Sequence, residues 1–353
     1  MDKLSLEKSF EHKRRSGIKA AVVLIILLLF LIVVSSNLGK ANLGFMDVIK
    51  IIIGNIFHQE TLYEGIKGAY VSIVWDIRLP RILTAVIVGA GLAASGAVFQ
   101  SLLMNPLADS YTMGISTGAA FGASIAIFLN LFVLSFQIPV ILFSFIGALL
   151  TLVLVMSIAN VKGYLNSSNM IIAGIIVSSI LSAGISFIKS ISGEGVSAIV
   201  NWLMGNLASR SWNHVQLGFL VVVFSLIVCM YYAEDLNLMS VGEKEARNLG
   251  VDVQRTRIML MVFGSMITAA CVSIAGIISF IGLIVPHMLR FLIGSDNRKI
   301  IPLSALMGGL LLLSADTLIR FALDVEIPVG ILTTLLGGPF FIYIFVKKNR
   351  TLF

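Results

Sequence analysis

Ten long apolar runs constrain this chain more than any other feature of its sequence. A helix needs about 17–25 predominantly apolar residues to cross the hydrocarbon core of a bilayer. Such runs cover residues 18–35, 82–104, 113–134, 138–158, 170–190, 214–233, 256–273, 275–293, 301–319 and 328–346. The chain is 58% hydrophobic and 12% charged, against roughly 45–50% and about 25% in soluble domains. We therefore predict an all-α integral membrane protein with ten transmembrane helices.

The cysteine content and the net charge do not change the prediction of an integral membrane protein. Cys229 and Cys271 both lie inside apolar runs, so they predict neither a disulfide framework nor a metal site. A net charge of +7 could indicate a nucleic-acid partner. In a membrane protein, however, basic residues mainly set the orientation and contact anionic headgroups, so we expect no nucleic acid.

The first apolar run has two interpretations. A basic tail precedes residues 18–35, which is also the arrangement of a secretory signal peptide. The run is longer than the usual apolar core of such a peptide, and no clear small-x-small cleavage site follows it. An uncleaved first helix is therefore the favoured interpretation.

The distribution of basic residues predicts the orientation. If the N-terminus is cytoplasmic, 17 of the 25 lysines and arginines lie on the inner side, as the positive-inside rule requires. Both termini are then cytoplasmic, with a cytoplasmic tail at 1–17, an external segment at 36–77 and a cytoplasmic loop at 234–255. Arg78, Arg81 and Arg320 all fall on the outer face, although they are far apart in the sequence.

The order of the helices suggests an internal repeat. The second to fifth helices and the seventh to tenth form two blocks of four, offset by five, and an odd offset reverses the orientation. Inverted repeats of this kind are frequent in transporters. The side chains of the two blocks are only weakly alike, so this repeat is predicted from the order of the helices alone.

The inner loop "EDLNLMSVGEKEARNLGV" resembles a piece of soluble protein. Ser240 and Glu243 have the spacing of a capping box, a short helix is predicted over Val241–Leu249, and Gly250 is placed to end it in the left-handed conformation. The helix could rest on lipid headgroups or dock a cytoplasmic partner. Three apolar side chains among charged ones favour docking: Leu238, Val241 and Leu249.

The catalytic motifs in the chain are few. There is no G-x-x-x-x-G-K-[ST] stretch, so any ATP must be hydrolysed by another chain. "GISTG" at 114–118 matches the serine-hydrolase pattern and raises the alternative of an intramembrane hydrolase centred on Ser116. That pattern belongs between a strand and a helix, whereas here it opens an apolar helix. The four histidines include no i, i+4 pair, so neither a metal site nor a nucleophile partner is predicted.

One acidic residue within an apolar run bears on a second alternative, a proton- or sodium-driven carrier. Asp316 lies four residues before Arg320, so an intrahelical ion pair is favoured over a proton relay. Proline predicts interruptions at Pro286 and at Pro339, and Asn105-Pro106 is predicted to end the second helix. Broken helices are typical of a substrate pathway.

Several ordered stretches together resemble the permease subunits of ABC importers for iron-siderophore and cobalamin, the FecCD-type family. They are "RLPRILTAVIVGAGLAASGAVFQSLLMNPLAD", "MGISTGAAFGA", "LNLMSVGEKEARNLGV", "GIISFIGLIVPHMLRFLIGSDNRKIIPLSALMGG" and "LSADTLIRFALDVEIPVGILTTLLGGPFFIYIF". The resemblance implies a type II importer, in which this chain is one permease domain over residues 1–353 with no catalytic role. Its partners would be a second permease copy or related permease, ATP-binding subunits in the cytoplasm and an external substrate-binding protein.

The resemblance also implies roles for individual residues. Arg78, Arg81 and Arg320 match the family's arginines that pair with glutamates of the binding protein, although anchoring to headgroups is an alternative. ATPase docking carries over to Ser240, Glu243, Arg247 and Gly250. A cytoplasmic gate carries over to Asn105, Leu107, Ser167 and Ser168, of which the two serines lie in the less distinctive stretch "YLNSSN".

Cofactor, substrate and location follow from the same resemblance. No cofactor or metal is expected in this chain, because ATP and Mg belong to the partner ATPase. The cargo is expected to be a ferric-siderophore-type chelate, with haem and cobalamin as alternatives, since recognition in such systems lies largely in the external binding protein. The expected location is the cytoplasmic membrane of a bacterium.

Overall fold

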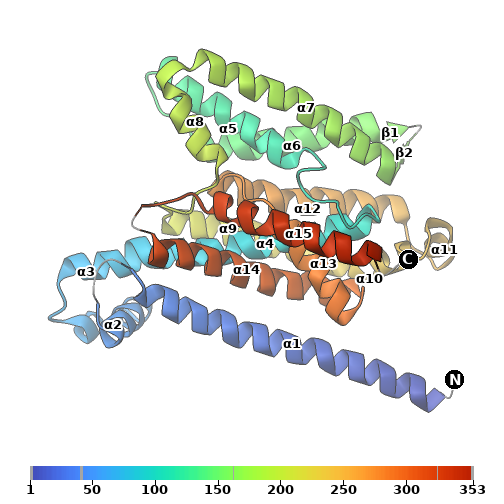
Figure 1. Ribbon diagram of the computed structural model, residues 1–353, viewed down its shortest axis with the longest axis horizontal. Helices are drawn as coiled ribbons and strands as arrows, with labels where there is room; N and C mark the ends of the chain where they lie inside the picture. Colours follow the sequence, from blue (N-terminus) through green and yellow to red (C-terminus); the bar gives the residue numbers. More distant parts are fainter. Residues whose placement is uncertain (1–2, 40–42, 162, 324, 351–353) are drawn as a thin grey trace.

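The computed structural model describes residues 3–39, 43–161, 163–323 and 325–350, and most of these residues are helical (Figure 1). The helices of the first half are α1 (Lys3–Asn37), α2 (Phe45–Ile56), α3 (Gly68–Ser72), α4 (Leu79–Leu102), α5 (Ile115–Phe132), α6 (Val140–Ala159) and α7 (Ser167–Ile191). Those of the second half are α8 (Val196–Leu203), α9 (Trp212–Tyr231), α10 (Ala233–Met239), α11 (Glu243–Asn248), α12 (Val253–Ala275), α13 (Ile281–Ile293), α14 (Asn297–Ala322) and α15 (Val329–Arg350).

Short elements complete the chain. The π-helical segment η2 (Ile73–Arg78) joins α3 to α4, and the 3-10 turns η1 (Glu60–Tyr63) and η3 (Gly193–Gly195) precede α3 and α8. A small antiparallel hairpin connects α6 to α7. Its strands β1 (Asn160–Val161) and β2 (Tyr164–Leu165) pair Asn160 with Leu165.

The ten predicted transmembrane runs are confirmed. In the part of the chain that the structure describes, eight helical segments are long and apolar enough to cross a membrane. Two shorter apolar helices, α13 and the Val329–Ile342 part of α15, coincide with the remaining two runs. The fold is therefore the all-α, ten-span architecture that the hydrophobic pattern predicts.

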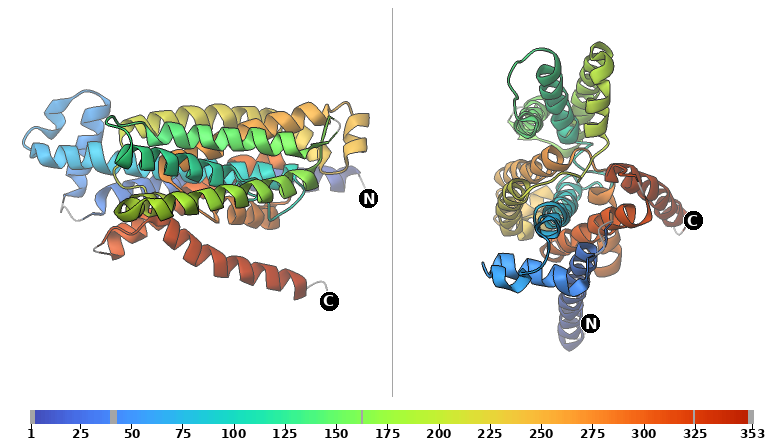
Figure 2. Two further views of the ribbon diagram at one scale, coloured as in Figure 1. Left: turned by 90° about the horizontal axis from the view of Figure 1, so that it is seen from above. Right: turned by 90° about the vertical axis from the view of Figure 1, so that its left-hand side faces the viewer.

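Helix α4 runs through the middle of the molecule. Most of its side chains are buried, and α9, α12, α13 and α14 pack around it. Figure 2 shows α5 to α8 as a group on one side of this centre, and α1 on the opposite side. Small residues permit the closest approaches, because a Cβ on Gly96 would collide with the carbonyl oxygen of Gly282 and one on Gly89 with that of Gly308.

The two ends of the bundle carry different structures, which we name the arginine end and the loop end. The arginine end holds Arg78 and Arg81 at the start of α4 and Arg320 at the end of α14, with α2 and α3 beyond them. The loop end holds α10, α11 and the hairpin β1–β2, together with the starts of α12 and α14. Figure 1 shows these ends at the left and the right of the bundle.

The helix containing Pro80 begins earlier than the apolar run. From Gly68 to Leu102 the chain is helical throughout, passing from α3 through η2 into α4. Proline has no N–H to donate, and in the wide turn just before it the N–H of Leu79 bonds the carbonyl of Val74, five residues back. Arg78 and Arg81 thus lie within a continuous helix.

The predicted break after the second helix is confirmed, but two other predicted breaks are wrong. Helix α4 ends at Leu102, just before Asn105-Pro106, whereas Pro286 and Pro339 lie inside α13 and α15, which continue past them. Neighbouring groups in a helical bundle can compensate for a missing N–H. The interruption occurs between α12 and α13 instead, where Gly276 and Phe280 take positive φ of 72° and 69°.

Candidate functional site

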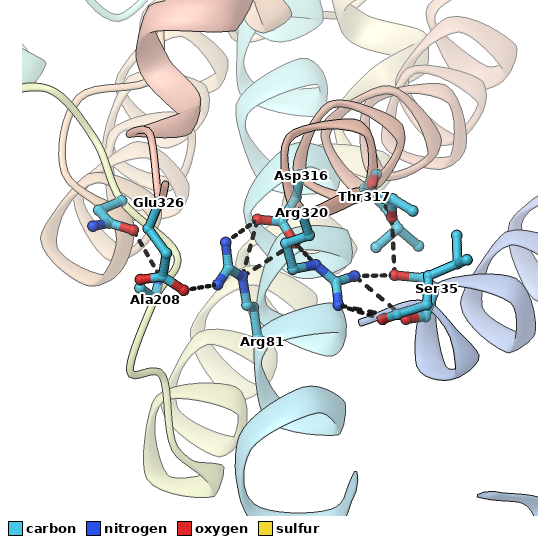
Figure 3. A network of polar contacts seen from close by, with 10 residues as sticks. Ser35, Arg81, Ala208, Asp316, Thr317, Arg320 and Glu326 are labelled. Carbon is cyan, nitrogen blue, oxygen red and sulfur yellow. Dashed lines mark hydrogen bonds and ion pairs between the residues drawn. The ribbon is translucent and has the colours of Figure 1, made fainter. Parts of the chain in front are cut away.

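The three predicted arginines line one pocket, and two of them, Arg81 and Arg320, meet at one buried carboxylate (Figure 3). Asp316 is fully buried, and its Oδ1 lies 2.9 Å from Nη2 of Arg81. Its Oδ2 lies 3.0 Å from Nε of Arg320, which confirms the predicted ion pair within α14. A single carboxylate thus fixes the guanidinium groups of two arginines that come from α4 and α14.

Two of these arginines also hold the end of α1. Arg78 donates to the carbonyl oxygen of Ser36 at 3.0 Å, and Arg320 donates to that of Ser35 at 3.4 Å. The hydroxyl of Thr317 reaches the Ser35 hydroxyl at 2.9 Å. The last carbonyl groups of a helix lack partners within it and carry partial negative charge. The arginines therefore fasten α1 to the centre of the bundle, a role that the sequence did not indicate.

The arginines are more buried than residues on an open rim. Arg78 is 6% exposed and Arg81 is 8% exposed. They nevertheless line an open pocket of about 340 Å³ at the arginine end, together with Arg320 and apolar side chains of η2 and of the segment after α14. A side chain that entered this pocket would meet all three guanidinium groups.

A second carboxylate of this chain, that of Glu326, pairs with a terminal nitrogen of Arg81. Oε1 of Glu326 lies 2.9 Å from Nη1 of Arg81, and the Glu326 side chain is 66% exposed. Glu326 belongs to the connection between α14 and α15 and also lines the pocket. Because it is exposed, this ion pair is weak compared with the buried pair at Asp316.

At the loop end, the predicted capping box is wrong. Ser240 lies at the end of α10, and its hydroxyl donates to the carbonyl oxygen of Asn237 at 2.6 Å. Gly242 precedes α11, whose first residue is Glu243. Serine can bond the carbonyl groups of the preceding turn as readily as the N–H groups of a following one. The predicted ending is confirmed, because Gly250 has a φ of +91° and donates to the carbonyl of Arg247 at 2.9 Å.

Helix α11 projects from the bundle with apolar side chains on its flanks. Val241 is 76% exposed and Leu249 is 68% exposed, whereas Ala246 between them is fully buried. Arg247 is exposed as well. Ala246 therefore anchors the helix, while its two ends present apolar side chains among charged ones.

The predicted gate residues lie where α4 ends and α7 begins. The hydroxyl of Ser167 donates to the carbonyl oxygen of Leu102 at 3.3 Å, so the two helix ends are in contact. Beyond Leu102, the side chain of Asn105 accepts the N–H of Leu107 at 2.9 Å. Ser168 is exposed, and its N–H donates to the side chain of Asn166, the N-cap of α7. No motif in the sequence singled out Asn166.

Asn237, which no motif in the sequence singled out, ties the loop end to α14. Its side chain accepts the N–H of Asn297 and donates to the Asp296 carboxylate, both at 2.8 Å. Burial alone would raise the pKa of the Asp296 carboxyl, but hydrogen bonds from Arg298 and Asn237 bring that pKa below its ordinary value. Asp296 is therefore held as an anion that fixes α10 against the start of α14.

Ser116, on which the hydrolase alternative depends, is buried in the bundle. Gly114 precedes α5 with a φ of +76°, and Ser116 in its first turn is 1% exposed. The Ser116 hydroxyl lies 3.0 Å from that of Ser110, another buried serine. A nucleophile needs an adjacent base and access to its substrate, and this burial argues against the hydrolase alternative.

Known proteins resemble this chain over nearly its whole length. The profile of the FecCD transport family matches residues 27–347. The cobalamin import system permease protein BtuC of Halobacterium salinarum is 43% identical over 289 residues, which cover 82% of this chain and 77% of that protein. The hemin transport system permease protein HmuU of Yersinia pestis is 34% identical over 323 residues, covering 89% and 92%.

A solved structure agrees with the whole bundle. It shows an inward-facing conformation of a protein assigned to the metal-chelate type of ABC transporter. The TM-score is 0.80 at 31% sequence identity, and the match covers 93% of this chain and 99% of the other. The arginine end, the loop end and the helices between them all lie within residues 27–347, which the family profile matches.

Proposed function

The chain belongs to the FecCD transport family, and from that premise we propose that it carries a ferric-siderophore-type chelate across the cytoplasmic membrane. As a member of this family it is the permease of an ABC importer, a membrane subunit without a catalytic site. ATP is hydrolysed in a separate partner. The proposal concerns the cargo, the orientation and the role of each end of the bundle.

The observation that carries the proposed orientation and partners is the contrast between the two ends. The arginine end offers a pocket lined by three guanidinium groups, which suits carboxylates of an external substrate-binding protein. The loop end offers α11 with exposed apolar flanks, which suits a cleft on a cytoplasmic ATP-binding subunit. The excess of lysine and arginine on the segments of the loop end supports this orientation, with both termini cytoplasmic.

The remaining partners follow from the same assignment. A second permease copy, or a related permease, completes the pathway, and ATP with Mg is bound by the ATPase subunits. Within this chain, Asn105, Leu107 and Ser167 close the cytoplasmic end of the pathway, where α4 and α7 meet. Ser168, which is exposed beside them, belongs to the same gate.

The cargo is proposed by chemical class. The relatives named above carry cobalamin and hemin, which are bulky metal chelates as ferric siderophores are. Cobalamin and haem are therefore the alternatives for this chain. Isolating the cognate binding protein and measuring its affinity for a ferric hydroxamate, hemin and cyanocobalamin decides among them, and the tightest ligand is expected to be the ferric hydroxamate.

Glu326→Gln is expected to strengthen docking of the binding protein at the arginine end. The carboxylate of Glu326 competes with a carboxylate of the binding protein for the Nη1 nitrogen of Arg81, and the substitution removes this competing charge. An exposed ion pair contributes about 0.2–1 kcal/mol, so the affinity should rise by up to about fivefold. Titration of the purified permease–ATPase complex with loaded binding protein, at low and high salt, measures this.

Glu194→Gln is the matched control, because Glu194 is an exposed acidic residue at the same end but outside the pocket. It should change the affinity much less than Glu326→Gln does. Weaker binding by Glu326→Gln would contradict docking at Arg81. Arginine-to-glutamate substitutions are less informative here, because a glutamate at position 81 would face the buried Asp316 and disturb the fold.

A further inference from the structure

Arg257 on α12 is a fully buried cation for which the sequence suggested no role. Its side chain is 1% exposed. Burial of an arginine is unfavourable unless its charge is paired and its N–H groups are bonded. One terminal nitrogen of Arg257 donates to the carboxylate of Glu243, and the other donates to the main-chain carbonyl oxygen of Leu165. Both partners lie outside α12.

These partners belong to two separate segments of the loop end. Glu243 is the first residue of α11, and Leu165 ends the hairpin β1–β2. Figure 1 places α11 and the hairpin at the same end of the bundle, near the start of α12. Arg257 therefore bridges the proposed ATPase-docking helix and the connection between α6 and α7.

Further contacts join the same segments. The guanidinium carbon of Arg247, on α11, lies 4.9 Å from the centroid of the Tyr164 ring in β2, within the range of a cation–π interaction. The side-chain amide of Gln254, on α12, lies 3.5 Å from the carbonyl oxygen of Gly163. Three successive hairpin residues are thus held by α11 or α12.

The hairpin leads directly to the proposed gate. Strand β2 is followed by Asn166 and by Ser167, the first residue of α7. The hydroxyl of Ser167 bonds the carbonyl of Leu102 at the end of α4, and the connection with Asn105 and Leu107 begins there. An unbroken series of contacts therefore runs from α11 through Arg257 and the hairpin to the connection between α4 and α5.

We propose that Arg257 is a positioning residue that makes α11, the hairpin and the start of α7 move as one unit. A displacement of α11 would then reach the gate. This inference rests on the proposed function, because it requires an ATPase to displace α11. If α11 moved alone, the charge of Arg257 would remain buried without its carboxylate. The guanidinium group therefore follows Glu243, and its other hydrogen bond, to the carbonyl of Leu165, carries the hairpin along. A planar guanidinium can hold both partners at fixed angles, whereas a lysine ammonium is a single point charge.

The test measures movement of the hairpin in the permease–ATPase complex reconstituted in lipid. Cys229→Ala and Cys271→Ala provide the background, and spin labels are attached at the exposed positions Asn160→Cys in β1 and Tyr231→Cys in α9. Trapping with ATP and vanadate is expected to shift the distance between the labels. Arg257→Lys is expected to abolish that shift while the ATPase remains associated.

The control is Arg255→Lys, the same substitution two residues earlier on an exposed side chain of α12. This variant should retain the full shift. If Arg257→Lys also retains it, the inference is overturned although the proposed function stands. If the unsubstituted complex binds the ATPase but shows no nucleotide-dependent shift, the inference is also overturned. If it binds no ATPase, the proposed function itself fails.

A second variant keeps the test valid if Arg257→Lys does not fold. Glu243→Gln removes the carboxylate from the other side of the pair, on a side chain that is 35% exposed. It should abolish the distance shift in ATPase complexes that still assemble. The accessibility of Leu107→Cys to a thiol reagent gives an independent reading, because its nucleotide dependence should be lost in the same variants. An unchanged shift and unchanged accessibility in Glu243→Gln would also overturn the inference.

Discussion

Asp316→Asn is expected to destabilise the protein more than any other single substitution of a polar residue at the arginine end. The asparagine keeps the shape of the side chain but removes the negative charge that both Arg81 and Arg320 contact. Removing one partner of a buried ion pair costs about 3–5 kcal/mol, because the remaining charge stays buried without compensation. The Tm in detergent should therefore fall by on the order of 10 °C.

The matched control for Asp316→Asn is Asp76→Asn. Asp76 lies at the same end, in η2, and its side chain is exposed. Its replacement should leave the Tm nearly unchanged, since substitutions of exposed residues usually alter stability by less than about 0.5 kcal/mol. Equal Tm values for the two variants would mean that Asp316 does not hold the arginines in place.

Val241→Asp combined with Leu249→Asp is expected to abolish association with the ATPase. Both side chains are exposed in the isolated chain, at 76% and 68%, so the substitutions should not disturb its fold. Apolar side chains at the centre of an interface contribute about 2 kcal/mol or more each when they are hot spots. The Kd for the ATPase subunit should therefore rise at least roughly 100-fold.

Copurification and a direct Kd measurement check this expectation, with the Tm as evidence that the variant is folded. Leu62→Asp serves as the control, because Leu62 is an exposed apolar residue at the arginine end and should not affect the ATPase. Undiminished association of the double variant would favour the other interpretation of α11, a helix that rests on lipid headgroups.

The transmembrane helices could be predicted from the sequence because a helix that crosses the bilayer needs about 20 consecutive, predominantly apolar residues. Such a run can be recognised without knowing any contact between distant residues. The ion pair of Asp316 with Arg320 was predictable for the same reason, since it lies within one helix turn. The second partner of Asp316 is 235 residues away, on another helix. No local periodicity identifies such a contact, so the burial of Arg81 had to come from the structure.

The loop end shows the same limit. The spacing of Ser240 and Glu243 matched a capping box, but each residue has a partner outside that motif, the carbonyl of Asn237 and the buried Arg257. Gly250 was correctly interpreted because a left-handed helix ending depends on the residue itself. The only feature of the sequence that pointed to Arg257 was its position as a cation at the start of an apolar helix. Its role depends on segments that meet only in the folded protein.

The most direct test of the central claim is uptake into proteoliposomes that contain this chain, its cognate ATPase and the external binding protein loaded with a ferric hydroxamate. Uptake is predicted to require ATP on the side of the ATPase, to stop when vanadate is added and to continue when a protonophore removes the proton gradient. Uptake that survives vanadate and collapses with the proton gradient would contradict the account and identify the chain as a secondary transporter.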